Sequence, residues 1–348
     1  MSYLVQGYRG IAALLVLLFH TSGITAAYFL EKNTLTLFFE FGRAGVEFFF
    51  VLSGFIMYIV HNKEFSNKNR LPAYFLKRII RIYPIYILIT LVVTLIVFLS
   101  PSYGEPYHRE FAPLIKSLFL IPQADLPHVG VGWSLVHEIL FYIIFSLFIF
   151  NKRVGVVIVV FWAISIIVFY VLTAPNFDGG GEGYFWKILF SRYSMLFICG
   201  MIVAYVLVNH SIRDRYAISA FITGNVLFLI SGMIFGQLEA AIPTVFFGLS
   251  SCLILFGCYN VFLEQTIKKI NVLEILGKAS YSIYLTHTFC ISFLCKVIVY
   301  FKINQYLSLT FMYFLIAIIT ILFGLIFFKY IEKPLAFQLN NRLNKKIL

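Results

Sequence analysis

Residues 154–174 read VGVVIVVFWAISIIVFYVLTA and contain no charged side chain. A helix of this length can cross the ~30 Å hydrocarbon core of a bilayer. Two basic residues, Lys152 and Arg153, stand directly before the run, as they do in loops that stay on the cytoplasmic side of a membrane. The stretch therefore predicts a transmembrane helix that starts at the cytoplasmic face.

The rest of the chain repeats this pattern. Of its 348 residues, 61% are hydrophobic and only 12% are charged, whereas soluble domains are about 45–50% apolar and 25% charged. We therefore expect an all-α polytopic membrane protein, a bundle of about ten transmembrane helices without a soluble domain. The predicted spans are 8–29, 42–61, 82–100, 133–150, 154–174, 186–208, 216–236, 241–263, 279–300 and 308–331.

The distribution of basic residues predicts the orientation of these spans. Alternate loops and the two ends of the chain hold 19 of the 27 Lys and Arg residues, so both termini are expected in the cytoplasm. The net charge of +12 thus indicates membrane orientation rather than nucleic-acid binding. The longest loop, 101–132, contains an apolar piece, 114–121, that is too short to span. All five cysteines lie in apolar runs, which argues against disulfides and a metal site.

Five ionisable residues of the predicted spans are expected between the midplane and the outer side of the membrane, where a charge is costly and function is the default hypothesis. At ~1.5 Å per residue, His20 is about 16 Å above Arg9, near the midplane. Each of the five also has a structural alternative, such as a hydrogen-bonded core histidine or an arginine that extends toward the interface. Their shared depth, from the midplane outward, favours a catalytic site. They are His20, Glu47, Glu138, Arg192 and His287.

A second group of ionisable residues lies at the cytoplasmic ends of two spans. Arg78 and Arg81 are three residues apart and so share a helix face. Lys77 precedes Arg78, and Arg9 lies at the start of the first span. Such a cationic cluster suits the phosphates of a nucleotide thioester. Basic residues that only anchor the topology would give the same pattern, so the local charge leaves both interpretations open.

Seven blocks of the sequence, in order, resemble the acyltransferase-3 family of integral-membrane O-acyltransferases. The Arg9–His20 spacing and the pair of arginines before Pro84 are part of this resemblance, which extends over nearly the whole chain. The blocks are YRGIAALLVLLFH (8–20), GRAGVEFFFVLSGF (42–55), KRIIRIYPIY (77–86), GWSLVHEILFY (132–142), SRYSMLFICGM (191–201), LGKASYSIYLTH (276–287) and Glu332-Lys333-Pro334.

The resemblance implies a transmembrane acyltransferase domain at 1–335, followed by a short basic cytoplasmic tail at 336–348 and no appended soluble domain. It also implies acetyl-CoA as the usual acyl donor, without a metal. The acceptor would be a hydroxyl of a surface or lipid-linked glycan, such as an O-antigen, capsule or exopolysaccharide, at the bacterial cytoplasmic (inner) membrane. Lipopolysaccharide and peptidoglycan are further acceptors of this family.

On this basis we expect His20 to act as general base or as an acylated relay, with Glu47 or Glu138 orienting its imidazole. Acyl-CoA phosphates would bind Arg9, Arg78 and Arg81. His287 could instead be structural, because tyrosines beside it offer hydrogen-bond partners. The residues expected at the acceptor side are Trp133, Tyr142, Arg192 and His287.

Two other classes of function fit parts of the pattern. A proton-coupled secondary transporter of a small organic solute would also carry intramembrane His, Glu and Arg. It would, however, often show two related halves, and no internal repeat is found here. A non-catalytic scaffold would tolerate the loss of His20. The glycan, the modified hydroxyl, the acyl chain, the membrane leaflet of the acceptor and the oligomeric state cannot be inferred from the sequence.

Overall fold

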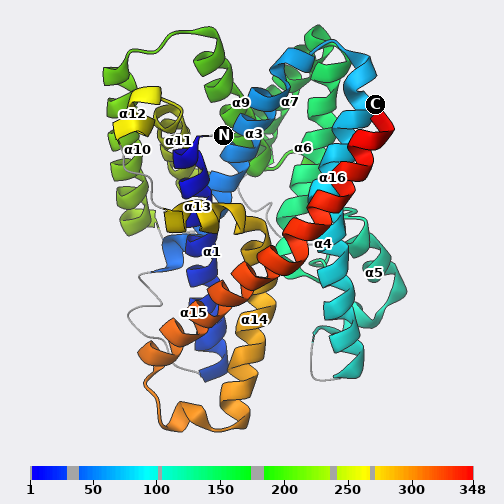
Figure 1. Cartoon of the computed structure of the whole chain (residues 1–348), viewed down its shortest axis with the longest axis vertical. Helices are drawn as coiled ribbons and strands as arrows, with labels where there is room; N and C mark the ends of the chain where they lie inside the picture. Colours follow the sequence, from blue (N-terminus) through cyan, green and yellow to red (C-terminus); the bar gives the residue numbers. More distant parts are fainter. Residues whose placement is uncertain are drawn as a thin grey trace. The chain divides into compact units, whose positions relative to one another are not determined.

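The computed structural model describes residues 2–29, 39–100, 104–173, 184–235, 241–266 and 271–347, and every element within these ranges is a helix (Figure 1). Nine candidate spans in this part of the chain are long and apolar enough to cross a membrane. The helices on which they are built are α1 (Tyr3–Phe29), α3 (Ala44–His61), α4 (Leu71–Leu99), α6 (Trp133–Phe150), α7 (Lys152–Thr173), α9 (Arg192–Asn209), α10 (Asp214–Phe235), α14 (Ser280–Tyr300) and α15 (Leu309–Phe327).

The all-helical class and the multi-pass character are therefore confirmed. The tenth predicted span, 241–263, corresponds to two helices, and its apolar part is shorter than the other nine. The shorter helices are α5 (Phe111–Leu118), α8 (Tyr184–Leu189), α11 (Ala241–Cys258), α12 (Val261–Thr266), α13 (Asn271–Lys278) and α16 (Lys333–Ile347). The single-turn helices are η1 (Glu40–Arg43), η2 (Asn62–Glu64), η3 (Lys68–Arg70), η4 (Pro106–Arg109), η5 (Gly130–Gly132) and η6 (Ile303–Gln305).

Exposed side chains on the long helices fit a lipid environment. In α7, Phe161 and Val171 expose 71% and 77% of their surface, although nearly every side chain of this helix is apolar. Water would not favour such a surface, whereas lipid tails cover it at no cost. The exposed apolar surface is therefore what the composition predicts for a protein that spans a bilayer.

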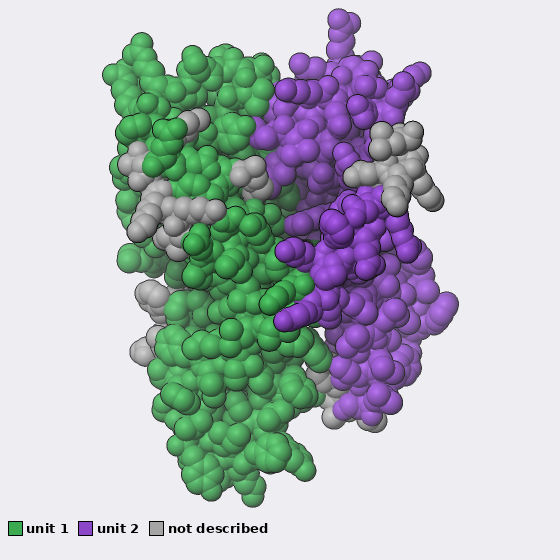
Figure 2. Space-filling model, in the orientation of Figure 1, with its two compact units in different colours: residues 1–55, 199–329 green, residues 56–198, 330–348 purple. Residues whose placement is uncertain are grey.

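The chain folds into two compact units, each assembled from two segments (Figure 2). Unit 1 consists of Met1–Phe55 and Cys199–Lys329, and unit 2 consists of Ile56–Ile198 and Tyr330–Leu348. A π-helix, Phe328–Glu332, contains the last boundary and continues directly into α16. The predicted tail, 336–348, is thus helical over its described residues.

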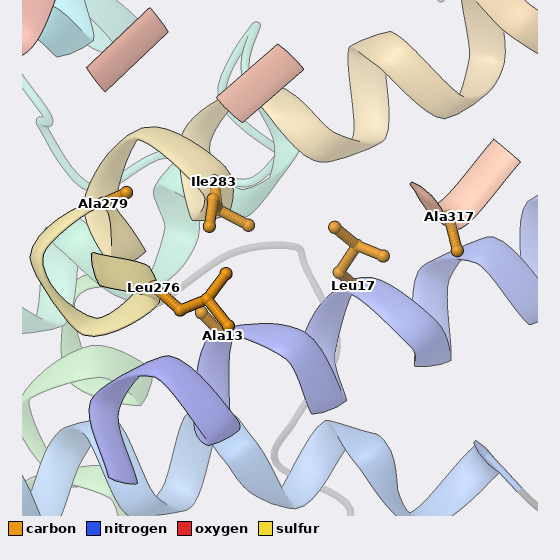
Figure 3. Close-up of a cluster of buried hydrophobic side chains, with 6 residues drawn as sticks. All are labelled: Ala13, Leu17, Leu276, Ala279, Ile283 and Ala317. Carbon is orange, nitrogen blue, oxygen red and sulfur yellow. The ribbon is translucent and has the colours of Figure 1, made fainter. Parts of the chain in front are cut away.

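In unit 1, α1 packs against α13, α14, α15 and η1. A cluster of buried side chains lies within unit 1 and comes from α1, α13, α14, α15 and the junction between α13 and α14 (Figure 3): Ala13, Leu17, Leu276, Ala279, Ile283 and Ala317. Half of these residues are alanines. Because lipid provides no hydrophobic drive between helices, small residues that allow close backbone approach stabilise such packing.

Two glycines set the register of α3 and η1 against α1. A Cβ on Gly42 would lie 2.2 Å from the carbonyl oxygen of Leu15, and one on Gly45 would lie 2.4 Å from that of Ala12. Only glycine permits this approach. One helical turn further along, the ring of Phe48 stacks on Tyr8 with centroids 6.0 Å apart. The two segments are therefore antiparallel, and their positions pair one for one.

In unit 2, α6 packs against α7, and α4 packs against α5, α6 and α16. Helix α4 has 29 residues and so is about 43 Å long, which exceeds the ~30 Å apolar core of a bilayer. Sequence hydropathy marked only its apolar part, from residue 82. The structure adds eleven residues at the N-terminal end, and these include Lys77, Arg78 and Arg81.

Candidate active site

His20 and His287 meet inside unit 1. Nδ1 of His20 lies 3.1 Å from Nε2 of His287 and 3.0 Å from the carbonyl oxygen of Val16. Nδ1 of His287 lies 2.7 Å from the carbonyl oxygen of Tyr284. His287 is fully buried, whereas the His20 side chain is partly accessible.

These contacts decide where the protons of the two imidazoles lie. A carbonyl oxygen can only accept, so Nδ1 of each histidine carries a proton. Nε2 of His287 then accepts the proton shared by Nδ1 of His20, which leaves Nε2 of neutral His20 with a free lone pair. An imidazole in this state is ready to accept a proton or to attack an electrophile. His287 supports the cation that would result.

Arg9 lies on the same helix as His20, eleven residues earlier. Its guanidinium donates to Oε1 of Gln6 at 3.3 Å and to Oγ of Ser280 at 3.1 Å. Ser280 opens α14, the helix that also carries His287. The same two helices thus hold a cation at one level and the histidine pair about 16 Å further along α1.

Glu47 is 4% exposed and lies in the first turn of α3. The register fixed by Gly42 and Gly45 places it level with residue 10 of α1, one residue from Arg9. His20 is about ten residues further along α1, or about 15 Å away. By this register Glu47 lies nearer along α1 to Arg9 than to His20, and its expected role in orienting the His20 imidazole stays a prediction. His287 contacts the His20 ring directly.

Unit 2 holds a second polar chain, centred on Arg78. The Nη2 group of Arg78 donates to Nε2 of His61 at 3.1 Å, and its guanidinium carbon lies 5.5 Å from the ring centroid of Tyr142. The hydroxyl of Tyr142 donates to Glu138 in a very short hydrogen bond. The hydroxyl of Tyr74 donates to the carbonyl oxygen of Tyr142 at 2.8 Å, which fixes α4 against α6.

A cavity of about 160 Å³ opens beside Arg78, between α4 and α16. Three cations of α4 and one carboxylate, that of Glu332, contribute to its wall. The residues that line it are Lys77, Arg78, Ile80, Arg81, Pro84, Ile85, Glu332, Leu335, Ala336 and Asn340. A small cavity with this excess of positive charge suits an anionic group such as a phosphate.

A third group gathers where α6 and α9 begin. The ring of Trp133 lies 5.2 Å from that of Tyr193 and 5.6 Å from that of His137. Arg192 is 9% exposed, donates to the hydroxyl of Tyr193 at 3.3 Å and stacks on its ring at 5.1 Å. Aromatic faces beside a cation form a surface that can pack on a sugar ring.

The protein-family comparison identifies the class of protein to which the chain belongs. The acyltransferase-3 family model, described as "Acyltransferase domain", matches residues 3–329. The chain belongs to the acyltransferase-3 family. This membership confirms the resemblance on which the site residues were chosen, and it establishes an acyltransferase rather than a transporter or a scaffold.

Curated relatives of this acyltransferase agree. The exopolysaccharide production protein ExoZ of Rhizobium meliloti is 29% identical over 275 residues, which cover 74% of this chain and 79% of ExoZ. A Staphylococcus aureus protein with the provisional name O-acetyltransferase is 26% identical over a region covering 95% of this chain and 56% of that protein. The chain thus spans about half the length of the staphylococcal relative. No solved structure matches the chain.

Within the acyltransferase, the structure brings together some predicted residues and adds others. It pairs His20 with His287 in unit 1, joins Arg78 to Tyr142 and Glu138 in unit 2, and places Trp133 near Arg192. Sequence reasoning missed His61, His137 and Tyr193.

His61 and Glu64 are spaced i, i+3, which could have drawn attention to them, but polar residues at a span end are usually interfacial. In the described part of the chain, no three His, Cys, Asp or Glu side chains cluster as metal ligands would.

Proposed function

We propose that this acyltransferase transfers an acetyl group from acetyl-CoA to a hydroxyl of a surface or lipid-linked glycan, with His20 as the general base. The observation that carries the proposal is the chain of hydrogen bonds from Tyr284 through His287 to His20, which leaves the lone pair on Nε2 of a partly accessible imidazole. A donor bound at Arg9 would lie on the same helix as this base.

In the proposed step, Nε2 of His20 takes the proton of the sugar hydroxyl while the oxygen attacks the thioester carbonyl. The C–S bond then breaks, and the departing CoA thiolate recovers the proton from His20. No net proton is consumed. The imidazolium that exists in between is stabilised by the carbonyl oxygen of Val16 and by Nε2 of His287.

A relay through acylated His20 uses the same lone pair. Nε2 would attack the thioester first, release CoA, and pass the acetyl group to the sugar. The two routes differ in one observable product: only the relay forms labelled protein when acetyl-CoA is supplied without an acceptor.

We assign the donor phosphates to Arg78 and Arg81 because both line the basic cavity of unit 2. Arg9 is assigned to the donor because it precedes His20 on α1. Glu47 is assigned to the surroundings of Arg9 in unit 1, and Glu138 accepts a hydrogen bond from Tyr142 beside Arg78 in unit 2. The residues assigned to the donor and the basic ends of the helices are proposed to face the cytoplasm. Both chain termini are proposed to lie on the same side of the bacterial inner membrane.

We assign the aromatic group at Trp133 in unit 2, with Arg192 beside it, to the acceptor, and we keep His287 of unit 1 as a further candidate on the acceptor side. The acceptor class rests on the name of ExoZ, a protein of exopolysaccharide production, and on the provisional O-acetyltransferase name of the staphylococcal relative. An exopolysaccharide, capsule or O-antigen unit presented from the extracytoplasmic side fits both.

The deciding experiment follows labelled acetate from acetyl-CoA into surface glycan in membranes that contain the wild type or His20→Ala at equal protein levels. Labelling by the wild type alone supports the proposal. Equal labelling by both proteins removes His20 from the mechanism. If neither protein labels glycan while donor hydrolysis proceeds, the acceptor class is wrong.

A further inference from the structure

His61 is 1% exposed and lies at the end of α3, within unit 2. Its Nδ1 lies 2.5 Å from Oε2 of Glu64, and its Nε2 lies 3.1 Å from Nη2 of Arg78. A guanidinium can only donate, so Nε2 of His61 accepts and the ring proton lies on Nδ1, from which it is donated to Glu64. The contacts on both sides of the ring thus fix one neutral tautomer.

Aromatic side chains hold the His61 ring in place. The ring of Tyr74 lies 5.1 Å away and that of Phe145 lies 6.1 Å away, both in edge-to-face geometry. Tyr74 and Phe145 stack on each other and are almost fully buried. A ring packed in this way loses little further freedom when it accepts a hydrogen bond from Arg78.

The contact also restricts Arg78. One nitrogen of its guanidinium is bound to His61, and the group lies against the ring of Tyr142. Among the described residues, Nε of Arg78 is buried and has no hydrogen-bond acceptor. Arg78 also lines the basic cavity. Its guanidinium is thus held in one orientation with donor capacity to spare.

The chemical identity of the partner matters for charge. A carboxylate at position 61 would hold Arg78 equally well but would neutralise it, which would weaken its attraction for a phosphate. A neutral imidazole accepts one N–H and leaves the full positive charge. Glu64 is separated from Arg78 by the width of the imidazole, where it sets the tautomer without pairing directly with the guanidinium.

We propose that His61 is a positioning residue that pre-orients Arg78 for the anionic part of the acyl donor. The inference rests on the proposed function, in which Arg78 contacts the donor phosphates. Pre-orientation lowers the entropy lost when the donor binds and so acts on donor affinity. The reacting atoms at His20 are not involved, so turnover at saturating donor should change little.

The test compares three variants of His61. His61→Gln places an amide oxygen near the position of Nε2 and can still accept from Arg78. His61→Asn places its acceptor near Nδ1, on the wrong side, and His61→Leu keeps the packing without an acceptor. Steady-state transfer from acetyl-CoA gives KM and kcat for each protein, and Arg70→Gln, an exposed cation just before α4, serves as the matched control.

We expect His61→Leu and His61→Asn to raise the KM for acetyl-CoA about 10-fold, as for the loss of one hydrogen bond to a charged group, with kcat within about 2-fold of the wild type. His61→Gln and Arg70→Gln should keep the wild-type KM. In an Arg78→Gln background, His61→Leu should add nothing to the rise in KM, because the residue it positions is gone.

Each other result is decisive. An Arg78→Gln protein with a raised KM, beside a His61→Leu protein with a normal one, overturns the positioning role and leaves the proposed function intact. A His61→Gln protein as impaired as His61→Leu, or additive effects in the double variant, also overturns it. If the wild type transfers nothing from acetyl-CoA, the proposed function fails, and this inference fails with it. A melting temperature in detergent identifies any variant whose loss is one of folding.

Discussion

Replacing His287 by leucine tests how the histidine pair works. The change removes the acceptor of one hydrogen bond from Nδ1 of His20, while the carbonyl oxygen of Val16 still accepts from the same N–H. The lone pair of His20 therefore stays on Nε2. A catalytic triad that loses its carboxylate loses about 10⁴-fold because the imidazole adopts the wrong tautomer, and that cause is absent here.

What His287→Leu does remove is support for the imidazolium that forms during transfer. A hydrogen bond to a charged group contributes about 1.5–3 kcal/mol. At 1.36 kcal/mol per factor of ten, we expect kcat to fall about 10- to 150-fold. His20→Ala removes the base itself and should cost more, on the order of 10²–10⁴-fold. His287→Gln offers an acceptor near Nε2 and should recover part of the loss.

The assay is initial-rate transfer of labelled acetyl from acetyl-CoA to glycan in membranes with matched protein levels. Equal rates for His287→Leu and the wild type would show that the pair contributes only packing. A loss as complete as that of His20→Ala would show that Val16 cannot hold the tautomer alone. Either result refutes the reasoning above.

Three further predictions concern other parts of the molecule. Gly45→Ala should destabilise the protein by about 1–3 kcal/mol through overlap with the Ala12 carbonyl oxygen, whereas Gly23→Ala, which meets nothing within 4 Å, should be neutral or slightly stabilising; equal melting temperatures in detergent would contradict this. Trp133→Ala should raise the KM for the acceptor about 10-fold with the KM for acetyl-CoA unchanged, and a rise in the donor KM instead would move Trp133 to the donor site. Burial, and then His128, lower the pKa of His108 to about 4, and its Nδ1 accepts from the backbone N–H of Glu105. Since the folded pKa lies below the unfolded value of about 6.5, this loop should lose stability as pH falls from about 6.5 to about 4. Proteolysis of the 104–128 loop should rise over that range, and His108→Asn should remove part of the rise; cleavage that is constant with pH would disprove the link.

The sequence predicted the membrane class and most helices because long apolar runs have one physical solution in a bilayer. It missed the extent of α4, since hydropathy records where lipid is favourable and not where a helix begins. It also merged α8 and α9 into one span, although the helix breaks at Phe190 and Ser191. Neither residue is a strong helix breaker, so the composition gave no sign of the break.

The sequence predicted which residues belong to the candidate site better than it predicted which of them contact each other. Depth along a span can be counted from sequence, and this placed His20 and His287 near one level. It could not show that they touch, because 267 residues separate them. The level of Glu47 along α1 could not be counted from the sequence, because the register of α3 depends on two glycines whose close approach to α1 is a tertiary property. The candidate role of His61 could be inferred only from its contact with Arg78, which the sequence does not show.

The separation of His20 from His287 also has a consequence for biosynthesis. Translation at about 5–20 residues per second delivers His287 roughly 13 to 50 s after His20. During this interval α1 holds an imidazole without its eventual neighbour, while α13, α14 and α15 are still being made. The segment that can pack against α1 early is the η1–α3 region, whose glycines fit its backbone. Substitutions at Gly42 or Gly45 should therefore reduce the amount of protein that survives cellular quality control, in contrast to site variants, which should accumulate normally and fail only in turnover.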